Sequence, residues 1–105
     1  MLKTDSMIDL HTHSAASDGS DSPAELVKNA VDAGLNAIAL TDHDTVSGLD
    51  EFISTPSERF LYRIPGLEFS CHYDKKEVHI VGLFIDPTDT TLQKQLEQRR
   101  QDRIT

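Results

Sequence analysis

A strand, a helix and a second strand follow one another within the first 40 residues, and this order constrains the fold most strongly. Residues 22–25, Ser-Pro-Ala-Glu, have the pattern of a helix N-cap with a capping box, and Gly34 is a typical helix end. Residues 37–40, Ala-Ile-Ala-Leu, are continuously apolar, which is typical of a parallel strand covered on both faces. With an earlier strand that begins at residues 7–10, the pattern predicts a βαβ unit and an α/β fold.

Further elements are expected along the rest of the chain. They are a short helix over residues 48–53, strands over 61–70 and 77–85 that pair as a hairpin through a turn at 74–76, and a helix over 91–104. Residues 1–6 are expected to form a short tail, and residues 7–105 have the size of one ordinary domain.

The acidic composition excludes several partners. The net charge of -8, from 18 acidic and 10 basic residues, argues against a long nucleic-acid duplex or an anionic membrane surface as partner. A single cysteine, Cys71, excludes an intrachain disulfide and a thiolate-rich zinc site, so we expect a cytoplasmic protein. No apolar stretch is long enough to span a bilayer. An anionic substrate remains compatible with this charge if divalent cations reverse the local sign.

Residue types that bind metal ions recur at or near strand ends. Taken alone, a His-x-His pair on one face of a strand is more often a pair of ordinary polar residues than a metal clamp. Repetition favours the metal site here. The candidate ligands are His11, His13, Asp18, His43, Glu68 and His79.

Imidazoles and carboxylates suit Mn²⁺, Zn²⁺ and Fe²⁺, and a carboxylate such as Glu68 can bridge two cations. For His79, which lies in a very apolar strand, a core histidine is as good an interpretation as a ligand when the residue is taken alone. Asp42 and Asp44 flank His43 and should point away from it by strand alternation. We expect them to support the site by accepting an imidazole N–H and fixing its tautomer.

Four motifs in order resemble one known family. They are His11-Thr12-His13-Ser14 with Ser17-Asp18-Gly19, then Leu40-Thr41-Asp42-His43-Asp44-Thr45, then Pro65-Gly66-Leu67-Glu68, and then Val78-His79-Ile80-Val81-Gly82. Together they resemble the polymerase and histidinol phosphatase (PHP) family, and their residues are most similar to those of its stand-alone phosphoesterase branch. That resemblance implies a distorted (βα)7 TIM-like barrel and hydrolysis of a phosphate monoester by metal-activated water. The implied substrate is a 3′-phosphorylated nucleotide or a short oligonucleotide.

The resemblance also implies a set of metal ligands. His11, His13 and Glu68 would hold the first of two or three divalent ions, Glu68 and His79 the second, and Asp18 and His43 the third, with Mn²⁺ as the favoured metal and Zn²⁺ or Fe²⁺ as the others. The family's further ligands, a histidine and an Asp-x-His pair, are expected downstream and do not occur in these 105 residues.

A closed barrel of this kind takes about 250 residues, so we expect residues 7–105 to be its N-terminal part. Its apolar faces and sheet edge would then be uncovered, which predicts self-association. The alternatives to the phosphoesterase are a non-catalytic domain for metal binding or assembly, a histidinol phosphatase and a polymerase-associated activity.

Overall fold

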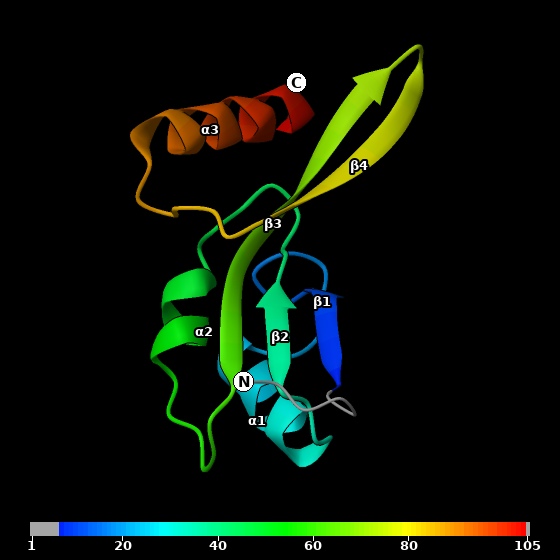
Figure 1. Ribbon diagram of the computed structural model, residues 1–105. Helices are drawn as coiled ribbons and strands as arrows, with labels where there is room; N and C mark the ends of the chain where they lie inside the picture. The colour runs from blue at the N-terminus through cyan, green and yellow to red at the C-terminus, as the bar shows by residue number, and fades with distance from the viewer. Residues whose placement is uncertain (1–6, 105) are drawn as a thin grey trace.

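The structure is a computed structural model that describes residues 7–104, so the predicted tail at 1–6 lies outside the described residues. The elements run in the order β1 (Ile8–Thr12), α1 (Pro23–Asp32), β2 (Ala37–Leu40), α2 (Leu49–Ser54), β3 (Tyr62–Tyr73), β4 (Lys76–Leu83) and α3 (Thr90–Ile104). The strands form one sheet in the order β1-β2-β3-β4 (Figure 1). β1, β2 and β3 pair in parallel, and β4 pairs antiparallel with β3. The predicted α/β class is confirmed. Over residues 7–104, the structure contains no helix whose length and apolar character would let it cross a membrane.

The predicted start and end of α1 are confirmed. The Glu25 N–H donates to Ser22 Oγ at 3.1 Å, and the Ser22 N–H donates to Glu25 Oε1 at 3.0 Å, which completes the capping box. After the helix, Gly34 has a φ of +83°, a left-handed conformation that costs glycine nothing. The Ala24 N–H donates to Glu51 Oε2 at 2.9 Å, so a carboxylate from α2 contacts the first turn of α1.

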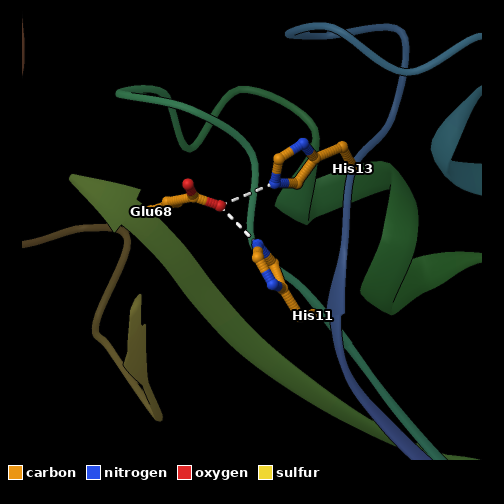
Figure 2. A group of neighbouring side chains, drawn as sticks. All are labelled: His11, His13 and Glu68. Atoms are coloured by element: carbon orange, nitrogen blue, oxygen red, sulfur yellow. Dashed lines mark hydrogen bonds and ion pairs between the residues drawn. The ribbon is translucent and has the colours of Figure 1, made fainter. Parts of the chain in front are cut away.

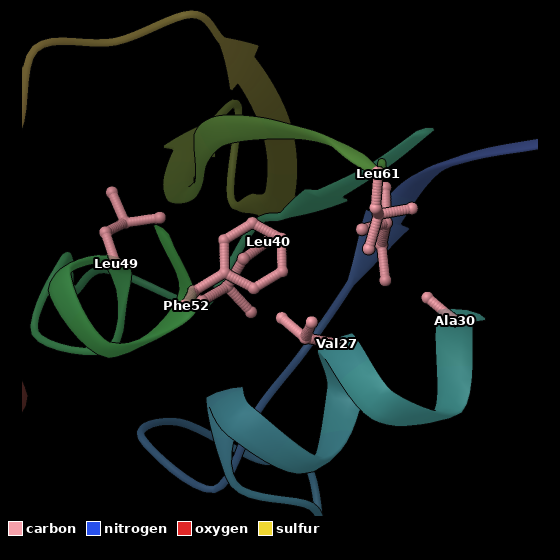
Figure 3. Packing of buried hydrophobic residues seen from close by; sticks show 7 residues of the cluster. Val27, Ala30, Leu40, Leu49, Phe52 and Leu61 are labelled. Atoms are coloured by element: carbon pink, nitrogen blue, oxygen red, sulfur yellow. The ribbon is translucent and has the colours of Figure 1, made fainter. Parts of the chain in front are cut away.

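The hydrophobic core lies between β2 and the two short helices. All four residues of β2 are buried, as its continuously apolar sequence predicts. Ile38 and Leu40 belong to a cluster with apolar side chains from α1, α2 and the residue before β3. Leu40 packs beside Phe52 and Val27 in this cluster (Figure 3). The buried members of this cluster are Val27, Ala30, Ile38, Leu40, Leu49, Phe52 and Leu61.

The opposite side of the sheet carries a second apolar surface, which we call the open face. It is lined by Ile8, Leu10, Ala37, Tyr62, Ile64, Leu83 and Phe84. Its outer members are exposed; Leu10 keeps 43% of its surface accessible and Phe84 keeps 75%. The predicted uncovered apolar face is therefore present, and self-association through it stays a prediction.

β3 changes its pairing partner halfway along its length. Residues 62–65 pair with β2, and residues 66–73 pair with β4. Gly66 lies at the change, where a Cβ would come within 2.7 Å of Thr41 Cγ2 and 3.0 Å of the Gly82 carbonyl oxygen. Only glycine fits there without displacing its neighbours, and the strand can therefore continue from the sheet into the hairpin.

The predicted hairpin is confirmed, but its strands differ in length from the prediction. β3 continues to Tyr73 instead of ending at Ser70, and β4 runs from Lys76 to Leu83 instead of Glu77 to Ile85. Asp74 and Lys75 have φ of 50° and 66°, so both central residues of the turn are left-handed, as in the tight turns that suit the twist of a hairpin. The hairpin projects beyond the rest of the sheet, and α3 lies beside it (Figure 1).

Candidate metal centre

His11 and His13 come from the end of β1 and converge on one oxygen of Glu68. His11 Nε2 and Glu68 Oε1 are in direct contact, and His13 Nε2 lies 2.8 Å from the same oxygen (Figure 2). The two imidazole rings are 5.1 Å apart with an interplanar angle of 66°. The register between β1 and β2 is irregular between Asp9 and Thr12. Both side chains reach the same carboxylate, as expected for a His-x-His pair on one strand face.

Backbone hydrogen bonds place His43 beside Glu68. The Glu68 N–H donates to the Asp42 carbonyl oxygen at 3.0 Å, and the Asp44 N–H donates to the Glu68 carbonyl oxygen at 2.9 Å. β2 itself ends at Leu40, so these two bonds extend its alignment with β3 to His43. His43 Nε2 then lies 3.5 Å from Glu68 Oε2.

The hairpin brings His79 to the other oxygen of Glu68. Glu68 pairs across the ladder with Val81, so His79 is its diagonal neighbour on the same face of the hairpin. His79 Nδ1 lies 2.6 Å from Glu68 Oε2. The His79 side chain is 41% exposed, so it is not a core histidine, and its role as a metal ligand stays a prediction.

Asp18 closes the cluster on the side away from Glu68. Its Oδ1 lies 2.6 Å from His13 Nδ1, and its Oδ2 lies 3.4 Å from His43 Nε2. The loop after β1 turns back tightly to allow this, since a Cβ on Gly19 would lie 2.3 Å from the His13 carbonyl oxygen. Glycine at that position is therefore part of what brings Asp18 to the imidazoles.

The charges of the cluster reinforce one another. Burial acts to raise the pKa of Glu68, but hydrogen bonds from His11, His79 and His13 outweigh it and lower the pKa to about 2. Burial acts to lower the pKa of His13, but hydrogen bonds to Glu68 and Asp18 raise that pKa above its ordinary value. The pKa of Asp18 is lowered, because its hydrogen bond with His13 outweighs the opposing effect of burial. Two carboxylates thus remain ionised among four imidazoles.

All six predicted ligands come together in three overlapping groups, in each of which the donor atoms lie within 4.8 Å of one another. The groups are His11, His13 and Glu68; His13, Asp18 and His43; and His43, Glu68 and His79. The donor chemistry fits divalent cations such as Mn²⁺, Zn²⁺ and Fe²⁺, which accept imidazole nitrogen and carboxylate oxygen together. Because Glu68 directs its two oxygens toward different groups, it is placed to be shared between two ions.

The expected role of Asp42 and Asp44 at an imidazole needs correction. The Asp42 carboxylate accepts hydrogen bonds from Ser14 and Ser17, and Asp44 Oδ1 accepts the Ser70 N–H at 3.1 Å. Within residues 7–104, the buried Nδ1 of His43 has no hydrogen-bond partner, so neither carboxylate fixes its tautomer. The Asp42 carboxylate is directed to Ser14 and Ser17 and not to His43, which agrees with the expected alternation, so only its expected imidazole partner was wrong.

Three serines near the centre were not among the sequence-predicted site residues. Ser17 and Ser70 line an open pocket together with Asp18, His43 and His79. Ser14 is fully buried beneath the loop that carries Asp18. The signal for Ser14 and Ser17 was their position directly next to His13 and Asp18, but serine is so common in loops that the sequence alone does not single them out.

Comparison with known proteins agrees with this geometry. Residues 9–100 match the PHP domain. Over 92 residues the chain is 42% identical to a 5′-3′ exoribonuclease of Haemophilus influenzae, covering 88% of this chain and 34% of that protein. Over 97 residues it is 39% identical to a 3′,5′-nucleoside bisphosphate phosphatase of Chromobacterium violaceum, covering 92% of this chain and 34% of the relative.

A solved structure of a proposed metal-dependent phosphoesterase from Bifidobacterium adolescentis superposes with a TM-score of 0.86 at 30% identity, covering 95% of this chain and 35% of that one. The chain thus spans about a third of the length of the proteins it matches. The match to the PHP domain extends over most of the chain and includes all six clustered residues, so the chain belongs to the PHP domain family.

Proposed function

We propose that this chain supplies the first part of the active site of a metal-dependent phosphoesterase. The observation that carries the proposal is the cluster of three overlapping donor groups around Glu68. Glu68 is almost fully buried and contacts imidazoles from three separate segments of the chain. A multinuclear metal centre requires such a shared carboxylate, whereas a purely structural cluster of histidines does not.

Each donor has a role in this proposal. His11 and His13 with one oxygen of Glu68 would hold one ion, and His79 with the other oxygen would hold a second. Asp18 with His43 would hold a third. When bound, two or three divalent cations supply an activated water and neutralise charge on the phosphate oxygens. Mn²⁺ is our first choice, with Zn²⁺ and Fe²⁺ as alternatives.

The substrate class is proposed from the relatives. One relative is named as a 5′-3′ exoribonuclease and another as a 3′,5′-nucleoside bisphosphate phosphatase, so the names give RNA and a nucleoside bisphosphate as the substrates of these two proteins. We infer that the complete protein hydrolyses a phosphate monoester of a 3′-phosphorylated nucleotide or a short oligonucleotide. The net charge of -8 supports a small substrate over a long duplex, because metal ions can reverse the sign only locally. A cytoplasmic location remains a prediction from the single Cys71, which cell fractionation would test.

Metal content and phosphate release test the proposal. The protein is incubated with Mn²⁺, freed of excess metal and analysed by mass spectrometry for bound metal. We expect His11→Ala to lower the metal content and the matched variant Cys71→Ser to leave it unchanged. An unchanged stoichiometry in His11→Ala would contradict the ligand assignment.

Activity is measured as phosphate release from adenosine 3′,5′-bisphosphate with Mn²⁺. The 105-residue chain is compared with a version extended, by the sequence that follows in the gene, to the length of the relatives. We expect release by the extended version. If that version bound metal and released no phosphate, the alternative of a non-catalytic metal-binding or assembly domain would replace the enzyme. Histidinol phosphate, tested in parallel, separates the histidinol-phosphatase alternative, and a polymerase-associated role would appear as co-purification with a polymerase.

A further inference from the structure

Asp42 is a buried residue next to His43 of the candidate metal centre, and both of its carboxylate oxygens accept hydrogen bonds. Its residue exposure is 2%. Oδ1 accepts the Ser14 N–H at 2.6 Å and the Ser17 hydroxyl at 2.8 Å, and Oδ2 accepts the Ser14 hydroxyl at 2.7 Å. A buried carboxylate with this many donors is held in one orientation, because moving it would leave both the charge and the donors without partners.

Each residue in this set is the neighbour of a proposed ligand. Ser14 follows His13, Ser17 precedes Asp18, and Asp42 itself precedes His43. The three ligands next to them form one of the donor groups, namely His13, Asp18 and His43. One carboxylate thus ties together the backbone segments that carry all three members of this group, although it contacts none of their imidazoles.

The surroundings leave this network little room to rearrange. A Cβ on Gly48 would lie 3.2 Å from both Asp42 Oδ2 and Ser14 Oγ, so the start of α2 packs directly against the pair. The Ser14 carbonyl oxygen accepts the N–H groups of Ser17 and Gly19, which fixes the same loop from within. Asp18, by contrast, is exposed, so its position depends on the anchored residues on either side of it.

We propose that Asp42 is a positioning residue whose carboxylate sets the spacing of Asp18 and His43 beside His13, and so determines the affinity of the ion that Asp18 and His43 would hold. The inference rests on the proposed metal centre and explains what holds its ligands at their distances from one another. Supporting groups of this kind change metal affinity by about 10- to 100-fold when they are removed.

Ser17 offers a test that spares the buried core. Ser17→Ala removes the hydroxyl that donates to Asp42 Oδ1 at 2.8 Å and also lies 3.3 Å from Asp18 Oδ1, whereas Ser17→Thr keeps this hydroxyl. Asp21→Asn alters a carboxylate in the same loop whose side-chain partner among residues 7–104 is Asn29. Mn²⁺ binding to the full 105-residue chain is titrated by electron paramagnetic resonance. Asp18→Ala identifies the binding step that belongs to the His13, Asp18 and His43 group, because it removes that ligand alone.

We expect Ser17→Ala to weaken that step at least tenfold and the other steps less, because His13 and His43 also belong to the other two groups whereas Asp18 does not. The Ser17→Thr and Asp21→Asn variants should remain within twofold of the unaltered protein. Asp42→Asn should weaken the same step, and it should speed the hydrogen exchange of the Ser14 amide in the metal-free protein. If Asp42→Asn does not fold, Ser14→Ala decides, because it removes a hydroxyl that donates to Asp42 Oδ2 and not to a proposed ligand.

Two results would overturn this inference and leave the proposed metal centre standing. The first is normal Mn²⁺ binding by Ser17→Ala when the unaltered protein binds Mn²⁺. The second is an equal weakening of every binding step together with a lower melting temperature. The second result would indicate a merely structural role. Absence of Mn²⁺ binding by the unaltered protein would instead overturn the proposed metal centre, and the inference with it.

Discussion

Replacing Glu68 with glutamine should destabilise the protein even when no metal is bound. Glutamine keeps the size of the side chain and one acceptor oxygen, but it removes the negative charge that faces His11, His13 and His79. The side chain of Glu68 is only 5% exposed, so water replaces little of the lost attraction. The change therefore tests whether the carboxylate holds the imidazoles together or is merely crowded by them.

The size of the effect follows from the pKa of Glu68. Its lowering from 4.5 to about 2 corresponds to roughly 3 kcal/mol, since a change of one unit in a pKa corresponds to about 1.4 kcal/mol. Because the folded-state pKa lies below the unfolded one, this stabilisation is complete above the unfolded value and disappears as the pH falls from 4.5 toward 2. His11 is 56% exposed, which screens part of the interaction, so we expect a loss of about 1–2 kcal/mol.

The assay is urea unfolding of chelator-treated protein at pH 6, where Glu68 is ionised because its pKa is lowered to about 2. The matched control is Glu77→Gln, which removes a 52% exposed carboxylate 3.4 Å from His79 Nε2 and should cost no more than about 0.5 kcal/mol. A Glu68→Gln protein as stable as the unaltered one, or more stable, would refute the reasoning. It would mean that the desolvation of Glu68 cancels its attraction to the imidazoles.

Three further predictions concern the rest of the fold. Phe52→Ala should lower the free energy of unfolding by about 3–5 kcal/mol, because Phe52 is fully buried in the core cluster; calorimetry or urea unfolding showing less than about 1 kcal/mol would contradict this packing. Ser22→Ala should cost about 1 kcal/mol and raise the pKa of Glu25, which hydrogen bonds with Ser22 now lower; an unchanged Glu25 titration by NMR would argue against the capping box. Phe84→Ser should reduce self-association in sedimentation experiments, because Phe84 is the most exposed large apolar side chain of the open face, and an identical sedimentation profile would point to another surface.

The local parts of the fold were the predictable ones. The capping residues of α1, the left-handed Gly34 and the buried β2 all follow from short sequence patterns that act over a few residues. The lengths of the hairpin strands were not predicted, because they depend on pairing between β3 and β4 across the ladder.

The members of the cluster around Glu68 could be named from the sequence, whereas the hydrogen bonds of Asp42 could not. His11 lies near the end of β1 and His13 directly after it, and Glu68 lies just past the part of β3 that pairs in parallel with β2. Parallel strands bring their carboxyl ends to one edge of a sheet, which places these residues together. Asp42 was expected at an imidazole, but the chain leaves regular strand geometry after Leu40, and the carboxylate turns instead to Ser14. Side-chain direction in an irregular segment depends on contacts between segments distant in sequence, which a strand pattern does not contain.

The contact between Glu51 and the first turn of α1 has a consequence for phosphate recognition. The free N–H groups at the start of a helix attract phosphate, and α1 follows β1 directly, so this end of the helix would be a natural phosphate site. Yet Pro23 has no N–H, and the N–H groups of Ala24, Glu25 and Leu26 already donate to Glu51 and Ser22. An incoming phosphate would have to displace a carboxylate of its own charge from this position. Among residues 7–104, the first N–H groups of α1 thus already have acceptors, and in the proposed phosphoesterase the attraction for a phosphorylated substrate would come from the cations proposed around Glu68.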